Sequence, residues 1–250
     1  MSSMVRTTNV LLLASLALAT APAAAQDAAD WDRARAAKAA AAPSPMAQAV
    51  ARWKLLTASD RFPFDDYASF LLSYPGFPEE AKLRSFAERA LERESPPAQR
   101  LVAYFDRYPA ITNAARARQA LALFELGRPE AVELGRAVWR GGPMSDLSEA
   151  ALSARLARVL TPADHDARMD ALLWAGAADQ AARQIAYVSA NRRDLFMARL
   201  AAVQGNDPEK LGIAIPAEAN ADPGWLYNRA RQLRRLAGAG AGTPWPRWSG

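Results

Sequence analysis

Apolar residues recur along most of this chain at intervals of three and four residues, which is the spacing of one face of an α-helix. The segment from residue 78 to 91 shows it clearly, with apolar positions at Leu83, Phe86, Ala87, Ala90 and Leu91. Strict alternation, the pattern of a half-buried strand, is confined to the short segment 212–215. The periodicity therefore predicts an all-α protein.

The best-defined helix of the sequence is predicted between Thr161 and Gly176. Thr161 can cap it, Pro162 suits its first position, and Asp164 completes a capping box three residues after the cap. Gly176 can supply the left-handed residue that ends a helix. A second helix is predicted at once, from 179 to 188, so the two form a helical hairpin.

Similar start and stop signals divide the rest of the chain into short helices. The sequence predicts one helix from Thr112 to Leu126, ending at Gly127, and a partner beginning at Pro129. A capping box of Asn191 with Asp194 predicts a further helix start. A cap followed by proline predicts others at Ser95-Pro96, Asp207-Pro208 and Asp222-Pro223.

The spacing of the glycines that separate these helices is uneven: they are Gly127, Gly176, Gly205 and Gly238. A strict repeat is therefore not expected. We predict an irregular superhelical solenoid of antiparallel helix pairs, in which each pair buries its apolar stripe against its neighbours. A compact helical bundle is the alternative.

Four sections are expected along the chain. Residues 1–25 resemble a cleavable signal peptide, with a basic Arg6, an apolar run over 10–19 and a small-residue site at 23–25, and imply export to the periplasm. Residues 26–45 read as an alanine-rich leader helix, and 46–237 as the superhelical domain. Residues 238–250 form a Gly/Pro/Trp tail that we interpret as a truncation.

Charge and composition restrict the partners. The chain carries a formal net charge of +5 and no cysteine. A basic exported protein is expected to meet anionic cell-wall polymers or lipid headgroups rather than nucleic acid. The simpler interpretation is that the arginines solvate helix faces, and it accounts for most of the charge. No later apolar run is long enough to predict a transmembrane span.

The sole histidine lies in an acidic cluster, Asp164-His165-Asp166, with Met169 and Asp170 one turn on. Such residues could form a metal or acid–base site. However, adjacent helical residues point in different directions, and acids in a first turn are favoured by the helix dipole. We therefore expect no metal, cofactor-binding or catalytic residue here.

The other acidic pairs are Asp65-Asp66 and Glu79-Glu80, which are expected to be first-turn acids. Glu94-Ser95 matches the Glu-Ser pair of a lysozyme-like catalytic helix, but Ser95 before two prolines is more simply a helix cap. An aromatic stripe could line a carbohydrate groove, although a packed core is the favoured interpretation; it comprises Trp53, Phe62, Phe64, Tyr67, Phe70 and Tyr74.

Two segments carry a resemblance to a known family: YASFLLSYPGFPEEAKLRSFAERAL (67–91) and LTPADHDARMDALLWAG (160–176). They resemble the N-terminal superhelical region of soluble lytic murein transglycosylases, bacterial periplasmic enzymes that cleave peptidoglycan. ANRRDLFMARLAA (190–202) and DPGWLYNRARQLRR (222–235) are similar to hairpins of the same family. The likeness covers about 46–236 and concerns architectural positions.

The resemblance implies a non-catalytic part of such an enzyme that binds or positions peptidoglycan glycan strands. The family's catalytic glutamate lies in a lysozyme-like domain after the superhelix, and its Glu-Ser helix and Gly-Leu-Met-Gln type motif do not occur in this sequence. We therefore expect this chain alone to be inactive on peptidoglycan. The alternatives are a periplasmic helical-repeat adaptor that binds a protein partner, and an independent enzyme using His165 or a carboxylate pair.

Overall fold

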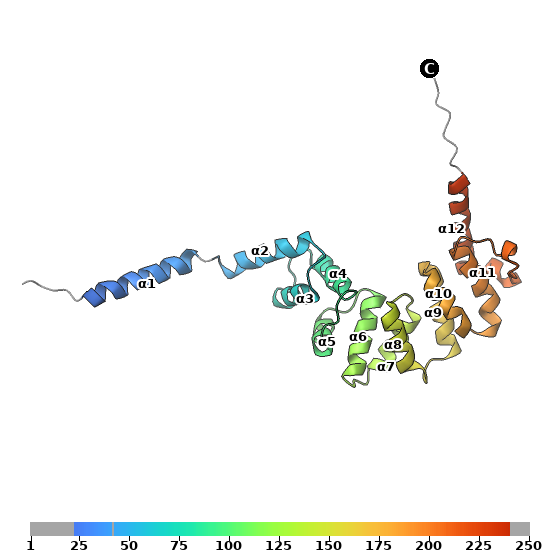
Figure 1. The fold of residues 1–250 in the computed structure, drawn as a ribbon, viewed down its shortest axis with the longest axis horizontal. Coiled ribbons are helices and arrows are strands. Elements are labelled where there is room, and N and C mark those ends of the chain that lie inside the picture. Colours follow the sequence, from blue (N-terminus) through green and yellow to red (C-terminus); the bar gives the residue numbers. More distant parts are fainter. Residues whose placement is uncertain (1–22, 42, 241–250) are drawn as a thin grey trace, which may run out of the picture. The chain divides into compact units, whose positions relative to one another are not determined.

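The computed structural model describes residues 23–41 and 43–240, and these ranges are helical without a strand. The α-helices are α1 Ala23–Ala41, α2 Pro45–Ala58, α3 Phe64–Ser73, α4 Glu80–Ala90, α5 Ala98–Arg107, α6 Asn113–Glu125, α7 Ala131–Arg140, α8 Asp146–Leu156, α9 Pro162–Ala175, α10 Ala178–Gln184, α11 Arg193–Val203 and α12 Pro223–Gly240 (Figure 1). Short 3-10 turns lie at Ile185–Tyr187, Ala190–Arg192, Glu209–Leu211 and Ala217–Ala221. The all-α prediction is confirmed.

The chain divides into two units between Arg52 and Trp53. In the first, α1 covers most of the expected leader helix and begins three residues earlier, at Ala23. Its residues from 29 to 40 are exposed. Most of the expected signal peptide, residues 1–22, lies outside the described residues, as do residues 241–250 of the expected tail.

In the second unit, helices pack on their neighbours in sequence and also on the helix after next. Thus α3 contacts α4 and α5, and α6 contacts α7 and α8. Likewise α7 contacts α9, and α9 contacts α10, α11 and α12. This continuous stacking of short antiparallel helices is the predicted irregular solenoid (Figure 1).

The local signals around α9 form as predicted. The Thr161 side chain accepts from the Asp164 N–H, and the Asp164 carboxylate accepts from the Thr161 N–H at 2.8 Å, which completes the capping box. Gly176 has φ 72°, a conformation that costs little only for glycine. The chain therefore turns sharply into α10.

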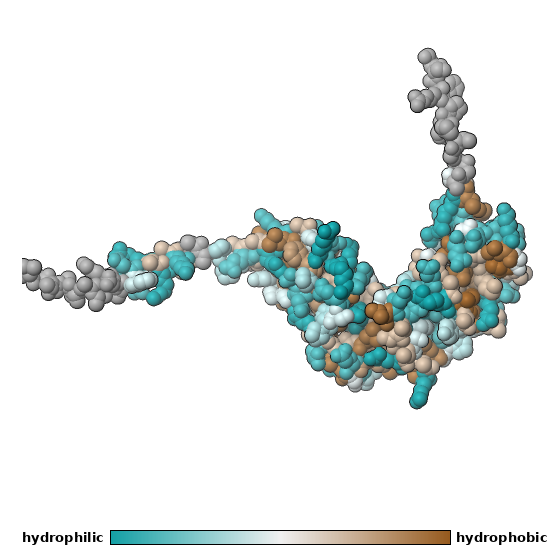
Figure 2. All heavy atoms as spheres, viewed as in Figure 1, coloured by the Kyte–Doolittle hydropathy of each residue, from teal (hydrophilic) through white to brown (hydrophobic). Residues whose placement is uncertain are grey.

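The core from α2 to α6 is rich in aromatic residues. Phe64 and Tyr67 are fully buried, and Tyr104 is nearly so. Phe64 packs edge-to-face on Tyr104 with ring centroids 5.2 Å apart. The aromatic stripe of the sequence therefore belongs to the core, as the favoured interpretation expected. Over the visible face of the chain, hydrophobic and hydrophilic residues are interspersed (Figure 2).

One predicted helix start is wrong because of the two prolines that follow it. Ser95 does not cap α5, which begins at Ala98 with Pro97 in the cap position. A proline disfavours the α conformation of the residue before it. Because Pro96 precedes Pro97, the helix does not begin at Pro96. The Ser95 hydroxyl instead accepts from Arg118 Nη2 at 2.8 Å.

Two further starts also differ from prediction. Asn191 lies in a 3-10 turn, and α11 starts after Arg192 without a side-chain cap, so no capping box forms with Asp194. Asp207-Pro208 leads only into the 3-10 turn that Gly212 ends with φ 69°. By contrast, Asp222 caps α12 as predicted, accepting from the Trp225 N–H at 2.7 Å.

Helix α12 runs into the first residues of the expected tail. Helix α12 continues through Gly240, three residues past the predicted end of the domain. Its last turns contain alanine, the best helix former. A side chain at Gly238 would meet nothing within 4 Å.

Candidate functional site

The three residues of the acidic cluster point to three different places. Asp164 faces α7, where it pairs with Arg136 at 3.2 Å and also with Arg140. Asp166 accepts from the Ser189 N–H at 2.8 Å, before α11. His165 lines a cavity towards α10. Among the described residues, no group of three histidine or acidic side chains could hold a metal ion.

Asp164 has a structural role. It is fully buried, and burial alone would raise its pKa. Hydrogen bonds from the Thr161 N–H and hydroxyl and from Arg140 and Arg136 outweigh burial and hold the pKa of Asp164 well below its usual range. Its carboxylate therefore stays charged, fixing the start of α9 and joining it to α7.

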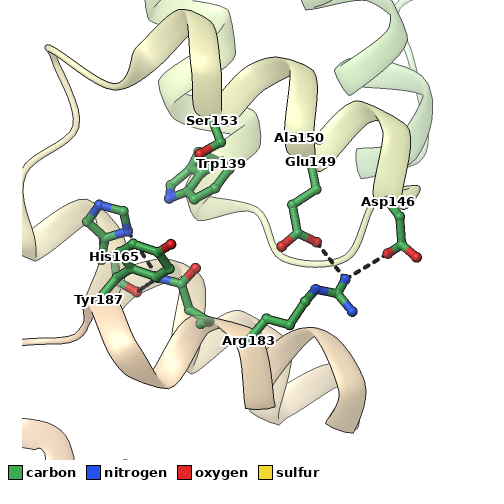
Figure 3. A pocket seen from close by; sticks show the side chains of 9 residues that line it. Trp139, Asp146, Glu149, Ala150, Ser153, His165, Arg183 and Tyr187 are labelled. Atoms are coloured by element: carbon green, nitrogen blue, oxygen red, sulfur yellow. Dashed lines mark hydrogen bonds and ion pairs between the residues drawn. The ribbon is translucent and has the colours of Figure 1, made fainter.

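The cavity that includes His165 lies between α7, α8, α9 and α10 and has a volume of about 610 Å³ (Figure 3). This volume lies within the range of small-molecule sites. One wall is aromatic, and it consists of Trp139, His165 and Tyr187. The opposite wall is charged, and it consists of Asp146, Glu149 and Arg183.

The aromatic wall presents a flat, accessible surface. The rings of His165 and Tyr187 stack with centroids 5.4 Å apart and planes inclined by 20°. Tyr187 lines the cavity and is 63% exposed, so much of its side chain is accessible from solvent. Trp139 stands edge-on to His165 at 5.8 Å and is almost entirely buried.

The charged wall is held by arginines from two helices. Arg183 Nη2 lies 2.7 Å from Asp146 Oδ1 and 3.0 Å from Glu149 Oε2. Behind them, Arg168 is fully buried, with Nη2 3.1 Å from Glu149 Oε2, and its guanidinium covers the Trp139 ring at 4.4 Å. Burial lowers the pKa of Arg168, whereas Glu149 opposes that shift. Glu149 is thus shared by two cations and keeps the wall rigid.

His165 is held in one orientation by Gln184. The amide Nε2 of Gln184 lies 3.0 Å from His165 Nδ1 and 3.3 Å from the His165 carbonyl oxygen. An amide N–H can only donate, so Nδ1 accepts and the neutral ring carries its proton on Nε2. Burial lowers the pKa of His165, and Arg168 adds to this, although Asp164 and Asp166 oppose it. His165 is therefore favoured in its neutral form.

The remaining acidic residues singled out from the sequence serve the fold. Glu94 accepts from the Phe64 N–H at 3.2 Å, at the start of α3. Asp65 pairs with Arg100 at 2.7 Å, and Glu80 accepts from the Gly76 N–H at 2.8 Å. Glu79 pairs with Lys82 at 2.9 Å. Each of these acids bonds to a backbone N–H or pairs with a basic side chain.

Sequence reasoning found His165 but missed the rest of the cavity. Trp139, Glu149, Arg183 and Tyr187 come from four separate elements. No motif joins them, because each is unremarkable in its own helix. The one signal of this cavity in the sequence was the sole histidine, His165, and the acids beside it were expected to serve the helix start.

Comparisons with known proteins give no family for this chain: no family model, curated protein or solved structure matches it. The functional argument therefore rests on the sequence resemblance and on the cavity between α7 and α10.

Proposed function

We propose that this chain is the non-catalytic superhelical part of a periplasmic lytic transglycosylase, and that it binds or positions glycan strands during peptidoglycan turnover. The sequence resemblance supplies the family and the compartment. The observation that carries glycan binding is the cavity in which the exposed Tyr187 ring lies opposite the Asp146, Glu149 and Arg183 wall (Figure 3).

The chemistry of the two walls suits a sugar. A pyranose has an apolar face of C–H groups, which packs on a flat aromatic ring, and hydroxyl groups around its edge, which bond to polar side chains. Hydrogen bonds with charged partners are stronger than those between neutral groups. Tyr187 supplies the ring, and Glu149 and Arg183 supply charged acceptors and donors already fixed in place.

Binding can be tested by cosedimentation of the purified full chain with peptidoglycan sacculi. We expect the wild type to sediment with sacculi and Tyr187→Ala to lose most of this binding. Trp31→Ala is the matched control, because Trp31 is exposed on α1 and does not line the cavity. Retention of full binding by Tyr187→Ala would overturn this cavity as the glycan site, and absence of wild-type binding would favour the adaptor interpretation.

The same samples test the expectation that the chain alone does not cleave glycan. A catalytic acid of a glycosidase needs a cleft that encloses the bond to be broken, whereas Glu94 is engaged with the start of α3. We expect no soluble anhydro-muropeptides after incubation with sacculi. Their release by the wild type and loss in Glu94→Gln would show that the chemistry lies within this chain.

A further inference from the structure

Helix α12 carries a stripe of apolar side chains that faces solvent. Its buried side holds Trp225 together with the amide side chains of Asn228 and Gln232. A second set of apolar residues recurs at intervals of four, three and four, which places them on one side of the helix, and all are exposed: Leu226, Ala230, Leu233 and Ala237. Leu226 is 51% exposed and Leu233 50%. The fold therefore leaves this α12 stripe uncovered.

Two aromatic rings lie beside the α12 stripe. Tyr227 follows Leu226 and packs on Trp174 of α9 with ring centroids 4.7 Å apart, and both side chains are exposed. Every residue from 233 to 238 is exposed, and this end of α12 extends past α11 (Figure 1). Leucines together with tryptophan and tyrosine on an exposed helical surface are typical of helices that lie in a membrane–water interface.

The charge of α12 has one sign. Its charged residues are all arginines, at positions 229, 231, 234 and 235, and it contains no acidic residue. Arg229 pairs with Asp207 at 3.4 Å. Among the described residues, no carboxylate pairs with the other three; Arg231 lies over the Tyr227 ring at 5.5 Å, and Arg234 is exposed. The surface around the α12 stripe therefore favours an anionic partner.

This combination of apolar and basic side chains narrows the choice of partner. Two copies of α12 packed stripe to stripe would bring their arginines together, and like charges repel. A hydrophilic polyanion would pair with the arginines but would leave the leucines in water. An anionic bilayer satisfies both groups, because arginine side chains can keep their charge at the headgroups while apolar side chains enter the layer below.

We propose that α12 binds the surface of an anionic phospholipid bilayer, with Leu226 and Leu233 at the boundary between headgroups and acyl chains and Arg234 among the phosphates. The contact is with the surface; within the described ranges, no helix is long and apolar enough to cross a membrane. This site is separate from the cavity lined by His165 and does not rest on the proposed glycan binding.

A fluorescent label on a single cysteine tests the insertion, because the chain has no cysteine of its own. Leu233→Cys carries an environment-sensitive label in the full chain, and Leu147→Cys is the matched control, since Leu147 is also exposed but lies on α8. We expect a blue shift of the Leu233→Cys label with vesicles of equal parts phosphatidylcholine and phosphatidylglycerol. Phosphatidylcholine alone, or the label at Leu147→Cys, should give none. The label reports its own surroundings, so lipid binding by the apolar run at 10–19 would not imitate this result.

Titration of the same label with anionic vesicles measures the two contributions. Arg234→Gln is expected to weaken binding about fivefold, the effect of one arginine at an anionic surface, and Leu226→Gln about tenfold, because a leucine no longer leaves water. Arg158→Gln, which removes an exposed arginine outside α12, should change little. Tyr187→Ala in the cavity should also leave vesicle binding unchanged.

Several results would overturn the proposal. A Leu233→Cys label that responds to neither vesicle, or equally to both, would contradict insertion into an anionic surface. A blue shift that appears without lipid as the protein concentration rises would assign the α12 stripe to a second copy of the chain. A response to poly-glutamate but to neither vesicle would assign it to an acidic polypeptide.

Discussion

The chain has two sections built from similar helices, α3 to α6 and α7 to α12. They differ in the side chains that lie between the helices of each section. In the first, aromatic rings from α3 and α5 interlock, as Phe64 and Tyr104 do. In the second, two arginines, Arg168 and Arg199, have no exposed surface at all. One section is held mainly by apolar packing, and the other adds buried ion pairs to it.

Three of the buried polar side chains of the second section, Arg168, Asn228 and Gln232, have a similar role. They bond to the carbonyl oxygens where a neighbouring helix ends, which otherwise have no partner. Arg168 Nη1 donates to the Gly142 carbonyl oxygen at 2.9 Å after α7. Asn228 donates to the Leu173 carbonyl oxygen at 3.1 Å near the end of α9, and Gln232 bonds the Asn206 carbonyl oxygen after α11.

Both sections hold buried polar atoms without a hydrogen bond. Aromatic rings fill the space between helices, whereas a guanidinium needs several fixed partners and is satisfied only in part. In the second section, Arg168 retains two buried nitrogen atoms without a hydrogen bond, and Arg199 and Trp139 retain one each. In the first section, Arg84 and Arg118 retain one each. Polar groups that are held in place and can still form a hydrogen bond are suited to binding a ligand. The cavity lined by His165 lies in the second section.

The largest effect is expected from the aromatic core. Phe64→Ala removes a fully buried ring and its contact with Tyr104, and we expect a loss of about 3–5 kcal/mol in the free energy of unfolding. Urea denaturation followed by circular dichroism measures it. Trp31→Ala, which truncates an exposed ring, should change little. A loss below about 1 kcal/mol in Phe64→Ala would contradict the role given to aromatic packing.

The next largest effect is expected from the buried ion pair between Arg168 and Glu149. Arg168→Met leaves Glu149 with Arg183 alone and removes the donor to the Gly142 carbonyl oxygen, so we expect a loss of about 3 kcal/mol. Adding Glu149→Gln should restore part of that loss, because the carboxylate that lost its partner is then neutral. If Glu149→Gln destabilises the Arg168→Met variant as much as it destabilises the wild type, the two residues are not coupled as the structure indicates.

A smaller, paired test concerns two glycines of α12. A Cβ at Gly224 would overlap Cζ and Nη2 of Arg199, which Asp170 and Asn228 hold in place, so Gly224→Ala should cost about 1–3 kcal/mol. Gly238 meets nothing within 4 Å, so Gly238→Ala should gain up to about 1 kcal/mol from helix propensity. Thermal unfolding of both variants gives the comparison. Equal effects would show that Arg199 is not fixed.

The smallest effect is expected from pH. Because the pKa of His165 is lowered in the folded state, the unfolded chain binds the proton more readily. The stabilisation from keeping this ring neutral is present above the unfolded pKa of 6.5 and is lost as the pH falls through it towards the folded pKa. Stability measured from pH 8 to 5 should fall for this reason, and less steeply in His165→Gln. Identical slopes would show that the ring titrates normally.

Local signals were sufficient wherever they acted within one or two turns. The capping box at Thr161, the left-handed Gly176 and the apolar stripe of α4 all formed as predicted, because they depend on residues three or four positions apart. The same reasoning failed at Ser95 and Asn191. Adjacent prolines follow Ser95, so α5 begins only at Ala98, and Asn191 lies within a 3-10 turn, so α11 begins only at Arg193.

The sequence by itself determined that this chain is a series of short helices with apolar stripes, since periodicity and caps are properties of neighbouring residues. Only the tertiary structure decided which buried charges pair and where a cavity remains. Trp139, Glu149, His165 and Arg183 belong to four helices, and they meet because α7 packs on α8 and α9, and α9 on α10. Such contacts depend on the stacking of whole helices, which no local spacing encodes.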